Sequence, residues 1–221
     1  MIDWNQIHTV FLDMDGTLLD LNFDNHFWLE HVPSRYAEHH GISIDEAKDI
    51  VFPRYHKVAG TMDWYCIDYW TRELGMDISV LKEEVDHLIA VHPYVPDFLS
   101  AVKRANKRLV LVTNAHGKSL ALKMRRTQLG GYFDNIICAH DYGVPKEDES
   151  FWARLQAKES FEPRQTLLVD DSLPVLRSAR DYGIEYLLAV YRPDTTRPAK
   201  DVEEFEAINS FIEIMPVEKE G

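Results

Sequence analysis

Short, unbroken runs of apolar residues recur along the chain, and polar residues follow each run. Apolar and polar positions do not alternate inside the runs, which is typical of strands that are buried on both faces. The runs are residues 10–12, 109–112, 136–139, 166–169 and 186–190. This pattern predicts a parallel sheet that is covered by helices on both sides.

Amphipathic segments separate the later apolar runs. They span residues 117–130, 147–158 and 172–182. Strand and helix therefore alternate with a repeat of roughly 25–35 residues, which predicts a doubly wound, Rossmann-like α/β core. A further short helix is expected around residues 205–214, and a frayed tail is expected after it, over residues 216–221.

One long segment, residues 21–91, interrupts this alternation because it contains no convincing strand pattern. Its apolar spacing predicts helices at about 22–40, 44–58, 63–75 and 78–90. Ser43 and Glu46 have the spacing of a capping box at the start of the second of these helices. We therefore expect a small helical domain, residues 21–91, inserted into a core domain formed by residues 1–20 and 92–221.

Composition and charge narrow the classes of function. The 221 residues are 45% hydrophobic and 28% charged, as in an ordinary soluble globular protein. Lys and Arg number 24 and Asp and Glu number 37, which gives a formal net charge of −13. Such an acidic chain repels nucleic-acid polymers and anionic membranes. With no apolar run of about 18 residues and no signal-peptide pattern, we expect a cytoplasmic protein, either a monomer or a weak homodimer.

Cysteine and histidine usage predicts neither a disulfide framework nor a zinc site. Cys66 and Cys138 lie far apart, with no Cys-x-x-Cys pair. The ten histidines contain no His-x-His or His-Glu-x-x-His pattern of the kind that binds zinc.

Two pairs of acids follow predicted strands, Asp13 with Asp15 and Asp170 with Asp171. In open α/β sheets the ligand crevice lies beyond the carboxyl ends of the strands, so these four side chains are expected to converge. Their like charges would repel one another unless a cation lay between them. A few carboxylates together with substrate phosphate oxygens are ligands that suit Mg²⁺.

Two further strand ends supply groups that suit an anion. Thr113 and Asn114 offer a hydroxyl and an amide directly before a predicted helix start, where backbone N–H groups favour phosphate. Lys146 stands in a Pro-Lys turn opposite the four acids and is expected to neutralise phosphate charge.

These motifs together resemble the haloacid dehalogenase-like (HAD) phosphohydrolase superfamily, over essentially the whole chain. They occur in the order of that family: Asp13-Met14-Asp15-Gly16-Thr17, Thr113-Asn114, Lys146 and Asp170-Asp171. The helical insertion corresponds to the cap that the family carries after its first strand. The resemblance therefore implies a HAD core with a helical cap.

Other stretches resemble the bacterial purine nucleotidases that act on GMP and IMP. These stretches are residues 18–25, 63–70, 113–116 and 145–148. The implied activity is that of a 5′-nucleotidase with a purine nucleoside monophosphate as its small-molecule substrate.

The resemblance also implies a role for each motif residue. Asp13 would attack phosphorus to form an aspartyl-phosphate, and Asp15 would act as general acid and then general base. Mg²⁺ would be held by the Asp13 carboxylate, the Asp15 backbone carbonyl and Asp171, with Asp170 acting through water. Thr113 and Lys146 would bind the remaining phosphoryl oxygens.

Substrate selection is expected to involve the insertion. Candidates at the substrate mouth, besides Asn114, are Asn25, Trp28, Arg54, His56, Trp64 and His116. The aromatic residues Trp64, Tyr65, Tyr69 and Trp70 fit the core of the insertion, and one of these rings also fits stacking on a purine.

Two alternative functions stay open. A sugar-phosphate phosphatase, or a β-phosphoglucomutase-like phosphotransferase, would keep the same chemistry and change the substrate or the acceptor. A non-catalytic phosphate-binding regulatory protein would keep the fold without turnover, but such proteins usually lack a catalytic residue. Here Asp13, Asp15, Thr113, Lys146 and Asp171 are all present.

Overall fold

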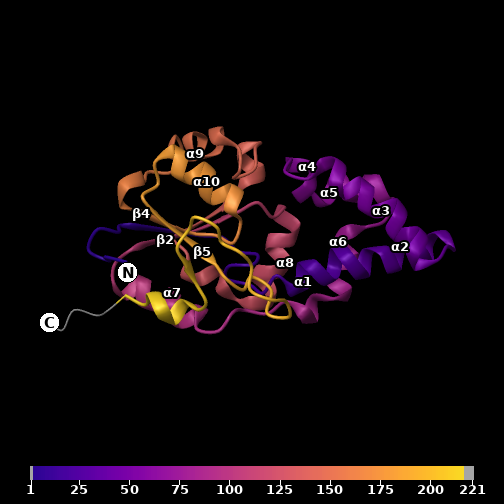
Figure 1. Ribbon diagram of the computed structural model, residues 1–221, viewed down its shortest axis with the longest axis horizontal. Helices are drawn as coiled ribbons and strands as arrows, with labels where there is room; N and C mark the ends of the chain where they lie inside the picture. The colour runs from indigo at the N-terminus through magenta and orange to yellow at the C-terminus, as the bar shows by residue number, and fades with distance from the viewer. Residues whose placement is uncertain (1, 217–221) are drawn as a thin grey trace.

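A six-stranded sheet forms the centre of the core (Figure 1). The computed structural model describes residues 2–216. The strands lie in the order β3-β2-β1-β4-β5-β6, and every neighbouring pair is parallel. Their bounds are β1 Thr9–Leu12, β2 Arg108–Thr113, β3 Asn135–Cys138, β4 Thr166–Val169, β5 Tyr186–Val190 and β6 Ala207–Ile208. The expected doubly wound parallel sheet is confirmed.

Helices cover both faces of the sheet, which explains why the strands lack alternation. On β1, Val10 and Leu12 belong to one apolar cluster and Phe11 to the other, and all three are buried. The first cluster includes side chains from α7 (Val95–Arg104) and α8 (Gly117–Thr127). The second includes side chains from α9 (Glu149–Gln156) and α10 (Leu173–Tyr182).

Helices also make up the segment between β1 and α7, which extends beside the sheet (Figure 1). They are α1 Asn22–His26, the π-helical turn η1 Phe27–His31, α2 Val32–His40, α3 Ile44–Val58, α4 Met62–Tyr65, α5 Ile67–Leu74, α6 Ile78–Glu84 and the 3-10 turn η2 Asp86–Leu88. We call residues 21–91 the cap. Its division from the core at residues 20 and 92 stays a prediction.

Two details of the cap helices differ from the expected spans. The helix expected over 63–75 is broken at Cys66, where the backbone is extended and the sulfur accepts the Tyr69 N–H at the start of α5. The helix expected over 78–90 ends at Glu84. The capping box is confirmed, because Ser43 Oγ accepts the Glu46 N–H and the Glu46 carboxylate accepts the Ser43 N–H.

The cap joins the core through two connections that lie side by side. Leu19 and Val91 form an isolated antiparallel bridge. The Asp20 N–H donates to the Ala90 carbonyl at 2.9 Å, and the His92 N–H donates to the Leu18 carbonyl at the same distance. Both connections thus leave the sheet beside the end of β1.

The prediction of a short helix over residues 205–214 near the C-terminus is wrong in part. Residues 205–214 do not form one helix, because Ala207 and Ile208 extend the sheet by pairing with Ala189 and Val190 of β5. Only the 3-10 turn η6 (Phe211–Ile214) follows. Of the tail that was expected to fray, residues 217–221 lie outside the described residues.

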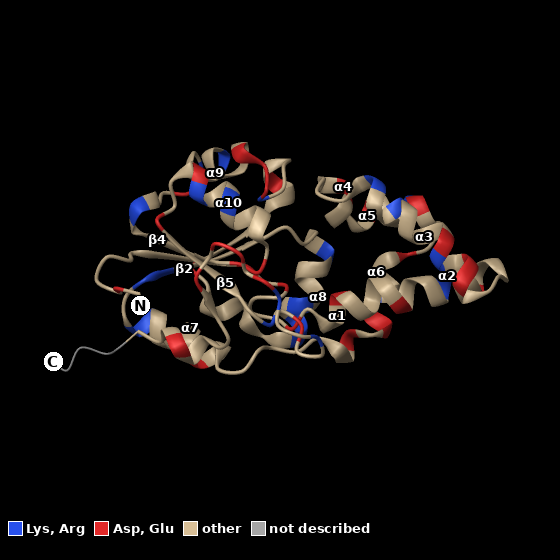
Figure 2. Ribbon diagram, viewed as in Figure 1, with Lys and Arg blue, Asp and Glu red and all other residues tan. Residues whose placement is uncertain are grey.

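Short 3-10 turns complete the core: η3 Leu129–Tyr132, η4 Ala139–Tyr142 and η5 Pro163–Gln165. Acidic and basic residues are interspersed over both the cap and the core helices (Figure 2). Within residues 2–216, none of the helices is both long and apolar enough to cross a membrane.

Candidate active site between the sheet and the cap

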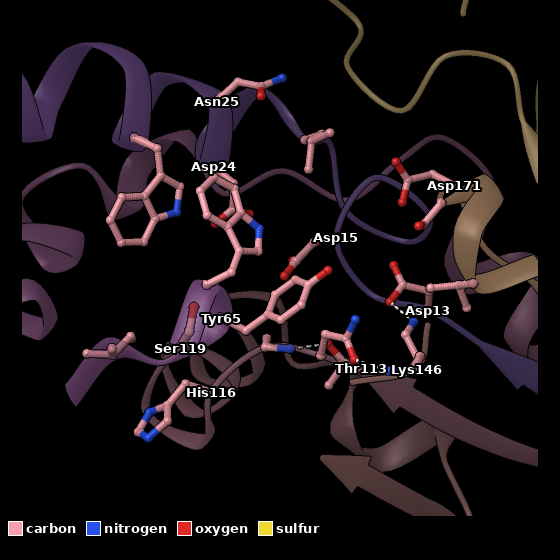
Figure 3. Close-up of a pocket in the computed structure, with 18 of the residues that line it drawn as sticks. Asp13, Asp15, Asp24, Asn25, Tyr65, Thr113, His116, Ser119, Lys146 and Asp171 are labelled. Atoms are coloured by element: carbon pink, nitrogen blue, oxygen red, sulfur yellow. Dashed lines mark hydrogen bonds and ion pairs between the residues drawn. The ribbon is translucent and has the colours of Figure 1, made fainter. Parts of the chain in front are cut away.

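The carboxyl ends of the central strands bring together side chains that are far apart in the sequence (Figure 3). Asp13 follows β1 and its N–H donates to the Val169 carbonyl of β4 at 3.0 Å. Asp170 and Asp171 follow β4, and Thr113 is the last residue of β2. The sheet therefore places the nucleophile candidate between the second acidic pair and the threonine.

Lys146 is the buried cation at the centre of this site. Its Nζ lies 2.5 Å from Asp13 Oδ1 and 2.6 Å from Asp170 Oδ2, and it also donates to the Val112 carbonyl at 3.0 Å. Burial alone would lower the pKa of this ammonium, but the two carboxylates outweigh burial and raise the pKa above its ordinary value. Lys146 therefore stays charged and holds both carboxylates in place.

Three carboxylates form a group that could hold a metal ion. One oxygen each of Asp13, Asp170 and Asp171 lies within 4.8 Å of the others. Burial, followed by the charges of Asp13 and Asp170, raises the pKa of Asp171 well above its ordinary value. The negative charge of the three carboxylates is therefore only partly neutralised by the nearby lysines. Mg²⁺ requires hard oxygen donors, which these carboxylates supply. The residues present fit a magnesium ion.

Gly16 allows this group to form. Its φ is +86°, and a Cβ added there would lie 2.8 Å from Asp171 Cγ. The backbone of the loop after β1 therefore lies directly against the Asp171 carboxylate. Lys200, which sequence reasoning missed, donates to the Asp171 carbonyl, and its Nζ lies 3.9 Å from Asp171 Oδ2.

The Asp15 side chain lies outside the three-carboxylate group and pairs with a second buried lysine. Lys123 Nζ of α8 lies 2.7 Å from Asp15 Oδ1 and 2.6 Å from Asp24 Oδ2 of α1. Lys82 Nζ of α6 completes the chain at 2.9 Å from Asp24 Oδ1. An ionic network thus links the general-acid candidate to the cap.

The network sets two pKa values in opposite directions. Burial raises the pKa of Asp15 to about 6, although Lys123 opposes this. Burial also acts on Asp24, but Lys123 and Lys82 outweigh it and lower the pKa of Asp24 to about 2. Sequence reasoning missed Asp24 and both lysines. No local sequence signal marked them, because their pairing arises from tertiary contacts between distant segments.

A cavity of about 360 Å³ extends from the strand ends to the cap. Asp13, Thr113 and Lys146 line one part of it, and aromatic side chains of the cap line another. These aromatic side chains are Trp28, Tyr55, Trp64 and Tyr65. The cavity therefore combines a charged end with an apolar, aromatic wall.

Five of the seven candidates for the substrate mouth line this cavity: Asn25, Trp28, Trp64, Asn114 and His116. The Asn25 amide donates to Asp194 at 2.7 Å. Asn114 Oδ1 accepts the Lys146 N–H at 2.9 Å, and its amide donates to Glu147 at 2.8 Å. Trp64 packs edge-on against Tyr55, and His116 stands directly before α8.

The remaining candidates are distributed differently. Arg54, His56, Tyr69 and Trp70 are not among the described residues that line the cavity. Trp70 is buried in the cap core, and its indole donates to the Trp64 carbonyl. Tyr65, by contrast, lines the cavity and donates to the Glu147 carboxylate, which joins the cap to the core.

Comparison with known proteins agrees with this geometry. A family model for haloacid dehalogenase-like hydrolases matches residues 7–183. The chain belongs to this hydrolase family. The GMP/IMP nucleotidases YrfG of Escherichia coli (strain K12) and Shigella flexneri are each 37% identical to it over 215 residues, which cover 97% of both chains. Together with the family match, the similarity to these nucleotidases shows that this HAD family member is a phosphatase.

A solved structure supports the fold. The crystal structure of a HAD phosphatase from Thermococcus onnurineus matches with a TM-score of 0.78 and 22% identity, over 94% of this chain and 96% of that one. The match extends over both the sheet and the helical insertion of this HAD protein.

Replacing Asp24 by Asn should strongly destabilise the protein, because two buried ammonium groups lose their shared countercharge. We expect a loss of about 3–5 kcal/mol in the free energy of unfolding at neutral pH, measured by urea denaturation. The contribution is present above the ordinary carboxyl pKa of 3.8 and is lost as the pH falls toward about 2. The exposed Asp49→Asn variant is the control, with an expected change within about 0.5 kcal/mol. Equal losses in the two variants would contradict this account.

Gly16→Ala should weaken the candidate metal site. The added Cβ would displace the Asp171 carboxylate and strain the backbone. We expect the Mg²⁺ concentration for half-maximal phosphatase turnover to rise at least about tenfold. Gly41→Ala is a matched control, since Gly41 has a φ of +66° but no atom within 4 Å of the added Cβ. An unchanged Mg²⁺ requirement in Gly16→Ala would refute the role of this turn.

Proposed function

We propose that this HAD phosphatase hydrolyses purine nucleoside 5′-monophosphates, GMP and IMP foremost, with Mg²⁺ and through an aspartyl-phosphate on Asp13. The observation that carries the proposal is the cavity, because it joins the Asp13–Lys146 pair to an aromatic wall within one space of about 360 Å³. That volume falls within the roughly 300–1,000 Å³ of small-molecule sites. The nucleotidase relatives support the choice of substrate.

Asp13 is the proposed nucleophile. Lys146 holds Asp13 Oδ1 at 2.5 Å, so the other carboxylate oxygen attacks phosphorus as the bond to the ester oxygen breaks. The proton that the leaving alkoxide needs comes from Asp15, whose pKa burial raises to about 6. A dehalogenase needs no such donor, whereas an alcohol leaving group does.

Hydrolysis of the aspartyl-phosphate reverses the proton transfer. Asp15, now ionised, takes a proton from water as the water oxygen attacks phosphorus. The bond between phosphorus and the Asp13 oxygen then breaks, which releases inorganic phosphate and regenerates the carboxylate.

Side chains at the ends of the strands bind the oxygens of the phosphoryl group that is transferred. Thr113 Oγ1 accepts the Ala115 N–H at 3.0 Å, which leaves its own hydrogen available for a phosphoryl oxygen. Lys146 contributes its fixed positive charge. Mg²⁺ held by Asp13, Asp170 and Asp171 would offset the remaining negative charge of the phosphoryl oxygens.

The cap supplies the proposed base-recognition surface. Trp28, Trp64 and Tyr65 line the cavity, and a purine stacks favourably on such rings. Asn25 of the cap and His116 of the core also line the cavity and add polar groups to it. We further propose that residues 21–91 act as one unit, which closes for phosphoryl transfer and opens for water entry and product release.

Two substitutions test the assigned chemistry. Asp13→Asn should abolish turnover, because an amide cannot form the aspartyl-phosphate. Asp15→Asn should lower kcat by about 10²- to 10⁴-fold, the usual contribution of a general acid and base. Phosphate release at saturating Mg²⁺ measures both, and circular dichroism checks that each variant is folded. Full activity in Asp13→Asn would exclude Asp13 as the nucleophile.

A substrate screen tests the proposed specificity. Phosphate release should be fastest, by kcat/KM, for GMP and IMP, and slower for pyrimidine nucleotides, sugar phosphates, phosphoglycolate and flavin mononucleotide. The physical reason for the preference over pyrimidine nucleotides, sugar phosphates and phosphoglycolate is that a purine buries more area on the aromatic wall than these groups do. A preference for sugar phosphates would overturn the nucleotide proposal and leave the phosphatase chemistry intact. Transfer of phosphate to a sugar without phosphate release would instead indicate a mutase.

A further inference from the structure

A second group of metal-ligating side chains lies at the boundary between the cap and the core, outside the carboxylate site. It consists of Cys66, His116 and His140, and one ligand atom of each lies within 4.8 Å of the others. Cys66 stands between α4 and α5 of the cap, whereas His116 precedes α8 and His140 lies in η4 of the core. We propose that these three side chains bind a divalent transition-metal ion of the Zn²⁺ type and so join the cap to the core.

The donor set selects the class of ion. One thiolate and two imidazoles are typical ligands of Zn²⁺, while Mg²⁺ prefers oxygen donors such as the three aspartates. Tetrahedral coordination with bonds of about 2.0–2.3 Å places ligand atoms about 3.5 Å apart. Because the present ligand atoms lie within 4.8 Å of one another, coordination needs an approach of at most about 1.3 Å, and three protein ligands leave a fourth position for water or another ligand.

His140 presents a free ligand atom. Its Nε2 is buried and has no hydrogen-bond partner among the described residues. A neutral imidazole keeps one nitrogen lone pair that can bind a metal ion. Burial lowers the pKa of His140 below its ordinary value, which favours the neutral, metal-binding form. A buried nitrogen of this kind is costly unless a ligand satisfies it.

His116 and Cys66 are positioned around the same point. The His116 ring stands edge-on to the His140 ring, with 5.0 Å between centroids. His116 Nδ1 accepts the Lys118 N–H at 3.3 Å and Asp68 Oδ2 lies 3.7 Å from Nε2, so binding an ion requires the ring to give up one of these two contacts. The Cys66 sulfur is held by the Tyr69 N–H at the start of α5. Burial lowers the pKa of His116 as well, so that both imidazoles are neutral near pH 7.

A bound ion would restrain the cap. Of the three ligands only His116 is among the described residues that line the catalytic cavity, so the ion would lie at the edge of that cavity and away from Asp13. It would connect the two parts whose separation lets product leave. Occupancy should therefore lower kcat without changing the chemistry at Asp13.

Cobalt spectroscopy tests the site directly. Co²⁺ is added to the purified full-length protein in saturating Mg²⁺, which occupies the oxygen-ligand site. We expect one equivalent to bind with a near-ultraviolet thiolate-to-cobalt charge-transfer band, and Zn²⁺ to displace it. Cys66→Ser should abolish the band, and His140→Gln should weaken Co²⁺ binding at least about tenfold.

Matched controls identify the ligands. Cys138→Ser removes the other cysteine and His87→Gln removes a cap histidine outside the cluster, and both should keep the band. Unchanged Mg²⁺-dependent turnover in Cys66→Ser would show that this variant is folded. The absence of a band in the wild type, or a band that persists in Cys66→Ser, overturns the proposed site.

Turnover measurements test the restraint on the cap separately. With Mg²⁺ in excess, micromolar Zn²⁺ should lower the kcat of the wild type and of Cys138→Ser, and should leave Cys66→Ser unaffected. Equal inhibition of Cys66→Ser would show that zinc acts at the aspartates, which overturns the restraint. The cobalt spectrum does not depend on which phosphomonoester is the substrate, so it is independent of the proposed nucleotidase activity.

Discussion

The buried ammonium of Lys146 is the interaction on which the site depends. Parallel strands deliver Asp13 and Asp170 to the same end of the sheet, where like charges in a buried environment repel strongly. Lys146 lies within 2.6 Å of an oxygen of each and so offsets that repulsion. The lysine comes from the loop after β3, so the carboxylates can converge only when the sheet is assembled. Removing one partner of such a group would leave an uncompensated buried charge.

Buried lysines also neutralise carboxylates at the boundary between the core and the cap. Lys123 lies between Asp15 of the core and Asp24 of α1, and Lys82 lies on the other side of Asp24. Tyr65 and Glu147 make a second link across the boundary. The general-acid candidate is therefore in electrostatic contact with the cap, which contacts the substrate in the proposed function. The proposed movement of the cap would change the surroundings of Asp15 as well as access to the cavity.

In the proposed function, specificity and chemistry come from different parts of this phosphatase. The strand ends carry charged groups that recognise any phosphoryl group, whereas the aromatic wall of the cap presents area and shape. A change of cap side chains can therefore alter the preferred phosphomonoester while Asp13, Asp15 and Lys146 keep their roles. The Cys66, His116 and His140 group takes one ligand from the cap and two from the core, and so is placed to influence their relative motion.

The sequence by itself determined the strands, the order of the motifs and the helical nature of the cap, because these follow from local apolar patterning and from the residue that ends each strand. Asp13, Thr113, Lys146 and Asp170 could be placed at one sheet edge for that reason. The 205–214 helix was wrong because pairing with β5 outweighed local preference there. Tertiary structure alone decided that Lys123 and Lys82 are buried beside carboxylates, that Lys200 reaches Asp171, and that Cys66 meets two histidines. These contacts join residues up to 108 positions apart, as for Lys123 and Asp15, and no local pattern encodes which distant side chain fills a buried space or neutralises a buried charge.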